Sequence, residues 1–335
     1  MNLRTLRYLV ALDEKRHFGQ AAEACFVSQP TLSAQIKKLE EELGVEMVER
    51  RHKNVLLTPV GVEMARRARR IIQQADEMVL LARSQQDPMA GQVRVGLIPT
   101  LAPYILPHVL PELRRRYPEL RCLLFEFQTL VLLDKLDRGE LDAAVLALPV
   151  PLDALEHRVV FEEPFFVAVA REHTLAEAGA VSIEALRNQT LLLLEDGHCL
   201  RDQALDVCAR VDVHESHDLR ATSLETLRQM VAANIGVTLL PGLATREHDV
   251  VVNLAIRPDP PTRSIALIWR SSNPRGTTLN VLAESLAESM RAATLPWQRT
   301  ADAATKSQPS DSTCSSTESM SSSSSRSRAR SERRR

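Results

Sequence analysis

Cys199 and Cys208 are the residues of this sequence best placed to do chemistry, because one short helix is predicted to carry both thiols. A strand is expected to end at Leu194, and Gly197 permits the turn that follows it. Cys199 would then lie in the first turn of the helix, where the positive end of the helix dipole favours a thiolate. A thiolate can attack a peroxide oxygen to give a sulfenic acid, and a second thiol can convert that acid to a disulfide.

The spacing of the two cysteines makes a disulfide incompatible with an intact helix. Nine helical residues would separate the two Cα atoms by about 13.5 Å and turn them to opposite faces, whereas a disulfide tolerates at most about 7 Å. Bond formation would therefore require the helix to unwind, so oxidation would be coupled to refolding. The alternative is that both cysteines only pack in a core, which is the commoner role of buried thiols.

Two hydroxyl-bearing residues could complete a peroxide site around Cys199. Thr100 and Thr129 each follow a predicted strand, and His198 directly precedes the cysteine. Ligands of open α/β sheets bind at the carboxyl ends of strands, and hydroxyl groups placed there can hydrogen-bond a peroxide. No second histidine or cysteine lies at ligand spacing from His198, so we expect neither a metal nor a cofactor.

The elements expected to position these residues alternate strands with helices after about residue 92. Seven apolar segments are typical of strands and are separated by amphipathic stretches, which predicts α/β architecture with a mainly parallel sheet. About two hundred residues of this pattern suit two doubly wound subdomains with a cleft between them. The predicted strands are 92–98, 122–128, 143–148, 165–170, 190–194, 236–240 and 264–269.

A long helix is predicted before this region. It should start at Thr58-Pro59, a cap followed by proline at the first helical position, and run to about Arg83. Small and apolar residues recur along it at spacings of four and three, which favours self-association over packing on the helix's own domain. These residues are Met64, Ala68, Ile71, Ala75, Met78 and Ala82.

The N-terminal residues, 1–58, combine three short helices with a charged hairpin, and the second and third helices have the spacing of a helix-turn-helix. The third helix is expected to begin after the cap residue Ser28 and to stop at Gly44. Polar groups at its start could reach base edges, and nearby cations could neutralise the phosphates of double-stranded DNA. A helical bundle used for protein contacts is the alternative. The candidate DNA-binding residues are Ser28, Gln29, Pro30, Thr31, Ser33, Lys37, Lys38, Arg50 and Arg51.

Several motifs of this region resemble the winged helix-turn-helix of LysR-type transcriptional regulators. The resemblance implies a homo-oligomer, usually a tetramer, in which a linker helix joins the DNA-binding domain to a two-subdomain effector domain. The motifs are Leu3-Arg4-Thr5-Leu6-Arg7-Tyr8-Leu9, Ala21-Ala22, Ser28-Gln29-Pro30-Thr31-Leu32-Ser33, Ile36-Lys37-Lys38-Leu39-Glu40 and Leu57-Thr58-Pro59-Val60-Gly61.

Over about residues 1–295, the chain further resembles the peroxide-sensing members of this family. The resemblance implies Cys199 as the peroxide-reactive thiol, Cys208 as the resolving thiol, and Thr100, Thr129 and His198 as the surrounding pocket. It also implies that oxidation changes the DNA footprint and engages RNA polymerase, with glutaredoxin or thioredoxin as reductant. The segments that carry the resemblance are 194–208, Gly96-Leu97-Ile98-Pro99-Thr100-Leu101-Ala102-Pro103-Tyr104 and Leu219-Arg220-Ala221-Thr222-Ser223-Leu224-Glu225-Thr226-Leu227.

Composition limits the remaining classes of function. The 335 residues carry a formal net charge of −1, so any DNA binding must come from a local patch. No apolar run is long enough to cross a bilayer, and the few cysteines suit a reducing compartment, so we expect a cytoplasmic protein. The sequence lacks a P-loop, a G-x-S-x-G and an H-E-x-x-H pattern, which argues against an enzyme. A regulator that binds a small metabolite in its cleft and a stand-alone thiol peroxidase remain as alternatives.

The chain is expected to divide into four parts: a winged helix-turn-helix over 1–58, a linker and dimerisation helix over 59–88, a redox-sensing effector domain over 89–296, and a disordered tail over 297–335. The tail is rich in serine and arginine and cannot form a packed core. Cys25 and Cys122 are expected to pack in cores, and Cys314 to be exposed in the tail.

Overall fold

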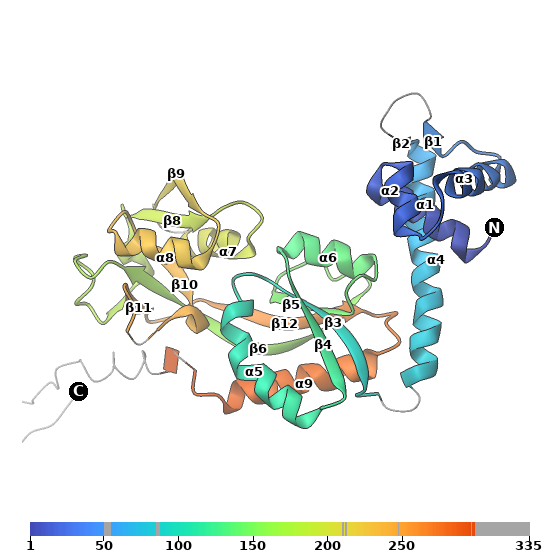
Figure 1. Cartoon of the computed structure of the whole chain (residues 1–335). Helices are drawn as coiled ribbons and strands as arrows, with labels where there is room; N and C mark the ends of the chain where they lie inside the picture. The colour runs from blue at the N-terminus through green and yellow to red at the C-terminus, as the bar shows by residue number, and fades with distance from the viewer. Residues whose placement is uncertain are drawn as a thin grey trace, which may run out of the picture.

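The computed structural model describes residues 1–49, 55–84, 88–209, 211, 213–246, 248–295 and 297–298. A helical N-terminal module is joined through one long helix to an elongated α/β region (Figure 1). The candidate residues Arg50 and Arg51 lie outside the described residues, as do Cys314 and the tail after 298.

The N-terminal module consists of α1 (Leu3–Lys15), α2 (Phe18–Ala24), α3 (Gln29–Leu43) and a hairpin of β1 (Val48–Glu49) with β2 (Leu56–Leu57). Ser28 caps α3 by accepting a hydrogen bond from the Thr31 amide at 3.4 Å, and Gly44 ends the helix with φ +68°. Both predicted boundaries of this helix are confirmed. Apolar residues from all three helices fill the core of the module, among them Leu9, Leu12, Ala21, Leu32, Ile36 and Leu39.

The long helix α4 (Pro59–Ser84) begins where the sequence predicts, because the Thr58 hydroxyl accepts a hydrogen bond from the Gly61 amide at 3.0 Å. The predicted apolar seam divides into two parts. Met64 and Ala68 pack on the N-terminal module, whereas Ile71 and Met78 are 41% and 73% exposed in the single chain. Within the described residues, no helix has the length and hydrophobicity needed to cross a bilayer.

The α/β region is built on an eight-stranded sheet in the order β4-β3-β5-β12-β6-β11-β7, with β10 also paired to β6. The sheet is mixed, so the prediction of a mainly parallel sheet is wrong. β3 pairs in parallel with β4 and β5, but β6 and β12 run antiparallel to each other and to further neighbours. The strands are β3 (Gly91–Leu97), β4 (Leu120–Glu126), β5 (Ala143–Ala147), β6 (Leu155–Val169), β7 (Ala180–Val181), β10 (Thr238–Pro241), β11 (Val252–Ile256) and β12 (Thr262–Arg270).

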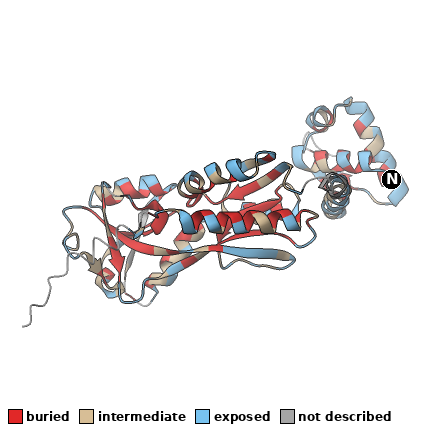
Figure 2. Cartoon of the chain, turned by 90° about the horizontal axis from the view of Figure 1, so that it is seen from below, coloured by how far each residue is buried: buried red, intermediate tan, exposed pale blue. Residues whose placement is uncertain are grey.

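Two separate cores divide this region into the two predicted subdomains. The first core gathers β3, β5 and β12 with helices α5 (Ala102–Arg116), α6 (Thr129–Asp137) and α9 (Gly276–Ala292). The second core lies under α7 (Cys199–Cys208) and α8 (Leu224–Ala232), with the parallel pair β8 (Thr190–Leu194) and β9 (His214–Ala221). Figure 2 shows the buried residues concentrated along the strands that run between these layers of helices.

The C-terminal packing extends past the predicted start of the tail. The Trp297 ring stacks on Phe161 with centroids 6.3 Å apart. The Trp297 indole also packs against Gly242, where an added Cβ would lie 2.6 Å from the ring. Trp297 therefore belongs to the effector domain, because its apolar ring gains burial there.

Candidate functional site

Helix α7 carries the two candidate thiols at its ends, as predicted. Cys199 is its first residue and Cys208 its last, and both are free thiols. The ten residues are α-helical, so the two Cα atoms lie about 13.5 Å apart. A disulfide cannot span that distance, so the described structure is that of a reduced protein whose helix would have to open before the two sulfur atoms met.

The two thiols of α7 belong to different cores. Cys208 is 2% exposed within the core of the second subdomain, and burial raises the pKa of its thiol to about 11. Cys199 is partly buried and packs against the core of the first subdomain. Cys25 and Cys122 pack on the edges of their own cores, as predicted, and burial raises the pKa of both thiols. Cys199 therefore has the access that Cys208 lacks.

The turn before α7 rests on the start of α6. Gly197 has φ +94°, and a Cβ added there would lie 2.6 Å from the Gln128 amide oxygen. A side chain at this position would therefore separate the turn from α6. His198 is buried, with its Nε2 atom 4.0 Å from Glu195. Burial lowers the pKa of His198 more than Glu195 raises it, so the imidazole is held neutral at pH 7.

Two of the predicted pocket residues line one cavity. Thr100 and His198 face a cavity of about 660 Å³ between the subdomains, together with Tyr104, Glu225 and Arg246. The structure does not place Thr129 or Cys199 in that lining. Thr129 is the first residue of α6, next to the Gln128 side chain that meets the turn before Cys199.

The Thr129 hydroxyl is a buried polar group of the predicted set that lacks a hydrogen-bond partner within the described residues. The residue is 8% exposed, and within the described residues its Oγ1 atom has no hydrogen-bond partner. A buried hydroxyl without a partner is costly. A small polar molecule in this place would remove that cost, because a hydroxyl can both donate and accept.

Sequence reasoning missed the ion pair that holds Thr100. Arg263, on β12, donates to Glu163 at 2.8 Å, and both side chains are almost fully buried. The same guanidinium donates to the hydroxyl and to the carbonyl oxygen of Thr100, each at 3.4 Å. A single arginine or glutamate beside an otherwise apolar strand was the available signal, because buried charges are normally paired.

A second missed feature is a set of four charges that fixes the start of α7. Arg201 donates to Asp196 at 2.9 Å and to Glu215, on β9, at 2.8 Å. Arg220, also on β9, donates to Asp196 at 2.8 Å and lies 3.5 Å from Glu215. These four residues, the α7 charge network, tie the first turn of α7 to the neighbouring strand.

The candidate DNA-binding residues gather along α3. Thr31 is exposed at its start, and its hydroxyl lies 2.8 Å from that of the cap residue Ser28. Ser33 is half-buried. The remaining described candidates, Gln29, Pro30, Lys37 and Lys38, are exposed. The start of the helix therefore presents polar side chains to solvent, and its two lysines follow further along.

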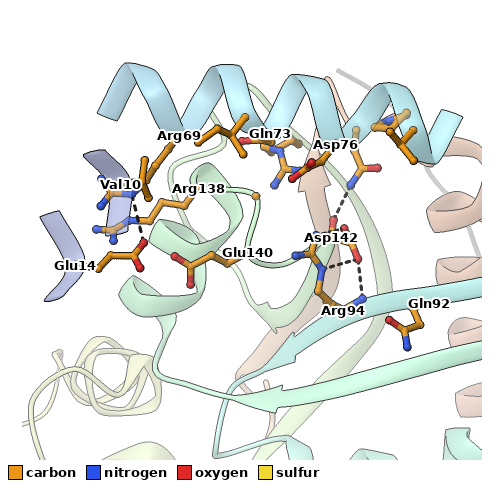
Figure 3. Close-up of a pocket in the computed structure, with 16 residues that line it drawn as sticks. Val10, Glu14, Arg69, Gln73, Asp76, Gln92, Arg94, Arg138, Glu140 and Asp142 are labelled. Carbon is orange, nitrogen blue, oxygen red and sulfur yellow. Dashed lines mark hydrogen bonds and ion pairs between the residues drawn. The ribbon is translucent and has the colours of Figure 1, made fainter. Parts of the chain in front are cut away.

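A further cavity of about 520 Å³ lies where the N-terminal module meets the first subdomain (Figure 3). Its lining carries charged groups of both signs, and some of them pair across it. Arg94 donates to Asp142 at 2.8 Å, and Arg69 lies 3.8 Å from Glu14 (Figure 3). The balanced charge favours a contact between two domains over a site for an ion of one sign. Among the described residues, no group of three or more histidine, cysteine, aspartate or glutamate side chains could hold a metal.

Two family models match this arrangement of domains. Residues 3–62 match the bacterial regulatory helix-turn-helix protein, lysR family, and residues 86–291 match the LysR substrate binding domain. The chain belongs to the LysR family of transcriptional regulators. Members of this family are transcription factors, so the chain is a DNA-binding regulator and not an enzyme.

Within that family the chain is similar to OxyR proteins. It is 46% identical over 290 residues to the DNA-binding transcriptional dual regulator OxyR of Escherichia coli K12, covering 85% of this chain and 95% of that protein. It is 45% identical over 294 residues to the hydrogen peroxide-inducible genes activator of Pectobacterium carotovorum subsp. carotovorum, covering 87% and 97%. The structure of full-length OxyR C199D from Pseudomonas aeruginosa superposes with a TM-score of 0.69 at 39% identity, covering 86% and 98%.

Proposed function

We propose that this regulator senses hydrogen peroxide through Cys199 and Cys208 and activates antioxidant genes when oxidised. The Cys199 thiolate attacks one peroxide oxygen, and the other oxygen leaves as hydroxide, so the sulfur becomes a sulfenic acid. The Cys208 thiol then attacks that sulfur and displaces the hydroxyl as water, which leaves one disulfide. The observation that carries the proposal is the position of the two thiols at opposite ends of α7, in different cores.

Thr100, Thr129 and His198 form the proposed peroxide pocket. The Thr129 hydroxyl supports this assignment, because it is buried and lacks a hydrogen-bond partner within the described residues. Neutral His198 can accept a proton from peroxide or donate a hydrogen bond to it, according to its tautomer. Arg263 is the proposed positioning residue, because it holds Thr100 by two hydrogen bonds.

The proposed output is a change in binding to double-stranded DNA. We assign Ser28, Gln29, Pro30, Thr31 and Ser33 to contacts with bases or to positioning of the helix, and the cations Lys37, Lys38, Arg50 and Arg51 to contacts with phosphates. Residues 59–88 are the proposed dimer contact within a tetramer, which the exposed Ile71 and Met78 support. RNA polymerase as the partner of the oxidised form, glutaredoxin or thioredoxin as the reductant, and a cytoplasmic location complete the proposal.

Thiol mapping by mass spectrometry tests the chemistry. The full-length Cys314→Ser variant removes a third thiol that could confuse the result, and it is treated with one equivalent of peroxide. We expect a Cys199–Cys208 disulfide that Cys199→Ser abolishes. In Cys208→Ser, a sulfenic acid at Cys199 should be trapped in its place. Unmodified thiols at this dose would contradict the proposal, and footprints in both redox states would then test the DNA response.

A metabolite-responsive regulator is the second candidate, because the cavity beside Thr100 has room for more than peroxide. It holds about 660 Å³, and its lining includes Arg246 and Glu225, which are paired with each other at 3.1 Å. Under this alternative, Cys199→Ser would keep its response to an added metabolite and the thiols would be incidental. Loss of every inducing response in Cys199→Ser would exclude it.

A further inference from the structure

Phe26 is the most exposed large apolar side chain of the described residues. Its ring is 95% exposed, although it lies in the turn between α2 and α3. Its neighbours Cys25 and Val27 both pack against the core of the N-terminal module. The ring of Phe26 therefore adds almost nothing to that core, because apolar surface that stays in water gains no free energy of burial.

The backbone presents this ring in a fixed direction. Phe26 has φ +56°, a left-handed conformation that is uncommon for a bulky residue and costs the fold free energy. Its amide donates to the Glu23 carbonyl at 3.0 Å, and the next amide, that of Val27, donates to the Ala22 carbonyl at 3.0 Å. The turn is thus closed on both sides of Phe26, so the ring projects from an ordered backbone.

Phe26 shares its end of the module with the polar start of α3. It precedes the cap residue Ser28 by two positions and the exposed Gln29 by three. Gln29 also lies beside the start of α2, because a Cβ added at Gly19 would be 3.7 Å from its amide oxygen. In a helix-turn-helix, these first residues of the third helix are the ones that enter the major groove.

We propose that Phe26 contacts the C5-methyl group of a thymine at the edge of each DNA half-site. The methyl group is the apolar feature of the major groove, and phenylalanine is one of the side chains that can contact it. This inference rests on the DNA binding proposed above and adds to it a specificity residue outside α3. DNA is favoured over a protein partner because the neighbouring exposed side chains, Gln29 and Thr31, are hydrogen-bonding groups rather than a continuous apolar surface.

Replacing thymidine by deoxyuridine tests the contact, because thymine and uracil differ only in the C5-methyl group. A specific duplex is first selected from random DNA with the full-length protein, and each thymine of a half-site is then replaced in turn. We expect one replacement to weaken binding by the wild type about fourfold, the value of one buried methyl group. Phe26→Ala should bind the thymine duplex about fourfold more weakly and show no preference for thymine at that position.

Matched controls separate this inference from the function on which it rests. Leu130→Ala removes another strongly exposed apolar side chain, on α6, and should keep the thymine preference of the wild type. Thermal unfolding should show that Phe26→Ala is no less stable than the wild type, because the ring is outside the core. If no wild-type duplex emerges from selection, DNA binding itself fails. If wild type binds specifically but Phe26→Ala keeps its thymine preference, or loses affinity equally for both bases, only the Phe26 inference is overturned.

Discussion

Removing the Arg201 guanidinium should make the cysteine pair easier to oxidise. Arg201 is the third residue of α7, and its side chain is only 12% exposed. It forms ion pairs with two carboxylates. Glu215 is 17% exposed, whereas Asp196 is 74% exposed. If the disulfide requires α7 to unwind, these bonds exist in the reduced form and are lost on oxidation. Arg201→Ala therefore destabilises the reduced form while leaving the oxidised form nearly unchanged.

The size of the effect follows from the burial of each partner. The bond to Glu215 is charge-assisted and mostly shielded, so its loss costs about 1.5–3 kcal/mol. The bond to Asp196 is exposed on one side and adds at most about 1 kcal/mol. For a two-electron couple, about 1.4 kcal/mol equals about 30 mV, so the Glu215 bond alone shifts the potential by about 30–65 mV. The shift is toward more negative potentials, because the reduced form is the one that loses stability.

Equilibration with glutathione redox buffers, followed by mass spectrometry of the Cys199–Cys208 pair, measures this potential. Arg138→Ala is the matched control, because it removes a charged bond of 2.9 Å to Asp134 within the exposed surface of α6. The control should leave the potential unchanged. A potential for Arg201→Ala within about 10 mV of wild type, or one shifted in the positive direction, would refute the idea that the α7 charge network holds the reduced form.

Three further outcomes follow from the geometry. The pKa of Cys208 is raised to about 11 from 9.0. The contribution of this thiol to the free energy of unfolding should therefore be constant below about pH 9 and fall by up to about 3 kcal/mol as pH rises through 11. Urea unfolding above about pH 9 should show a flatter profile in Cys208→Ala. Gly197→Ala should lower the free energy of unfolding by about 1–3 kcal/mol, through the left-handed backbone and the contact with Gln128. Gln128→Ala in the same chain should recover only the contact part, and full recovery would show that the backbone conformation is unstrained. Thr31→Ala should weaken binding to a specific duplex more than binding to random DNA, by about 1–3 kcal/mol if Thr31 contacts a base. Lys38→Ala should weaken binding to the two kinds of DNA alike and reduce the salt dependence of binding. Titrations at several salt concentrations measure both effects.

Local signals in the sequence were sufficient for the helices that position the site. The cap at Ser28, the left-handed Gly44 and the Thr58-Pro59 start each lie within a few residues of the boundary they define. The same holds for α7, whose first residue follows from the strand end and the glycine turn before it. Such boundaries depend on hydrogen bonds between near neighbours, which a single sequence contains.

The pairing of β6 with β12 was not predictable in the same way. β6 extends over Leu155–Val169, but only 165–170 is continuously apolar in sequence, since the earlier part is half-exposed and carries charges. Its antiparallel pairing with β12 joins residues about a hundred positions apart. The ion pair of Glu163 with Arg263 depends on that pairing, and so does the placement of Arg263 beside Thr100.

The division of the two thiols between two cores also implies competition between two products of oxidation, an internal disulfide and a mixed disulfide. A sulfenic acid on Cys199 can react only with a thiol that reaches it, and Cys208 is withheld until its own core opens. A small thiol that gains access to the partly buried Cys199 would compete in the meantime, at a rate that rises with its concentration. Under the proposed mechanism, the opening rate of α7 would then decide whether a given oxidation ends as an internal disulfide or as a mixed disulfide with a cellular thiol. If α7 opens fast, the response of the protein would depend on peroxide alone. If α7 opens slowly, the response would also depend on the concentration of cellular thiols.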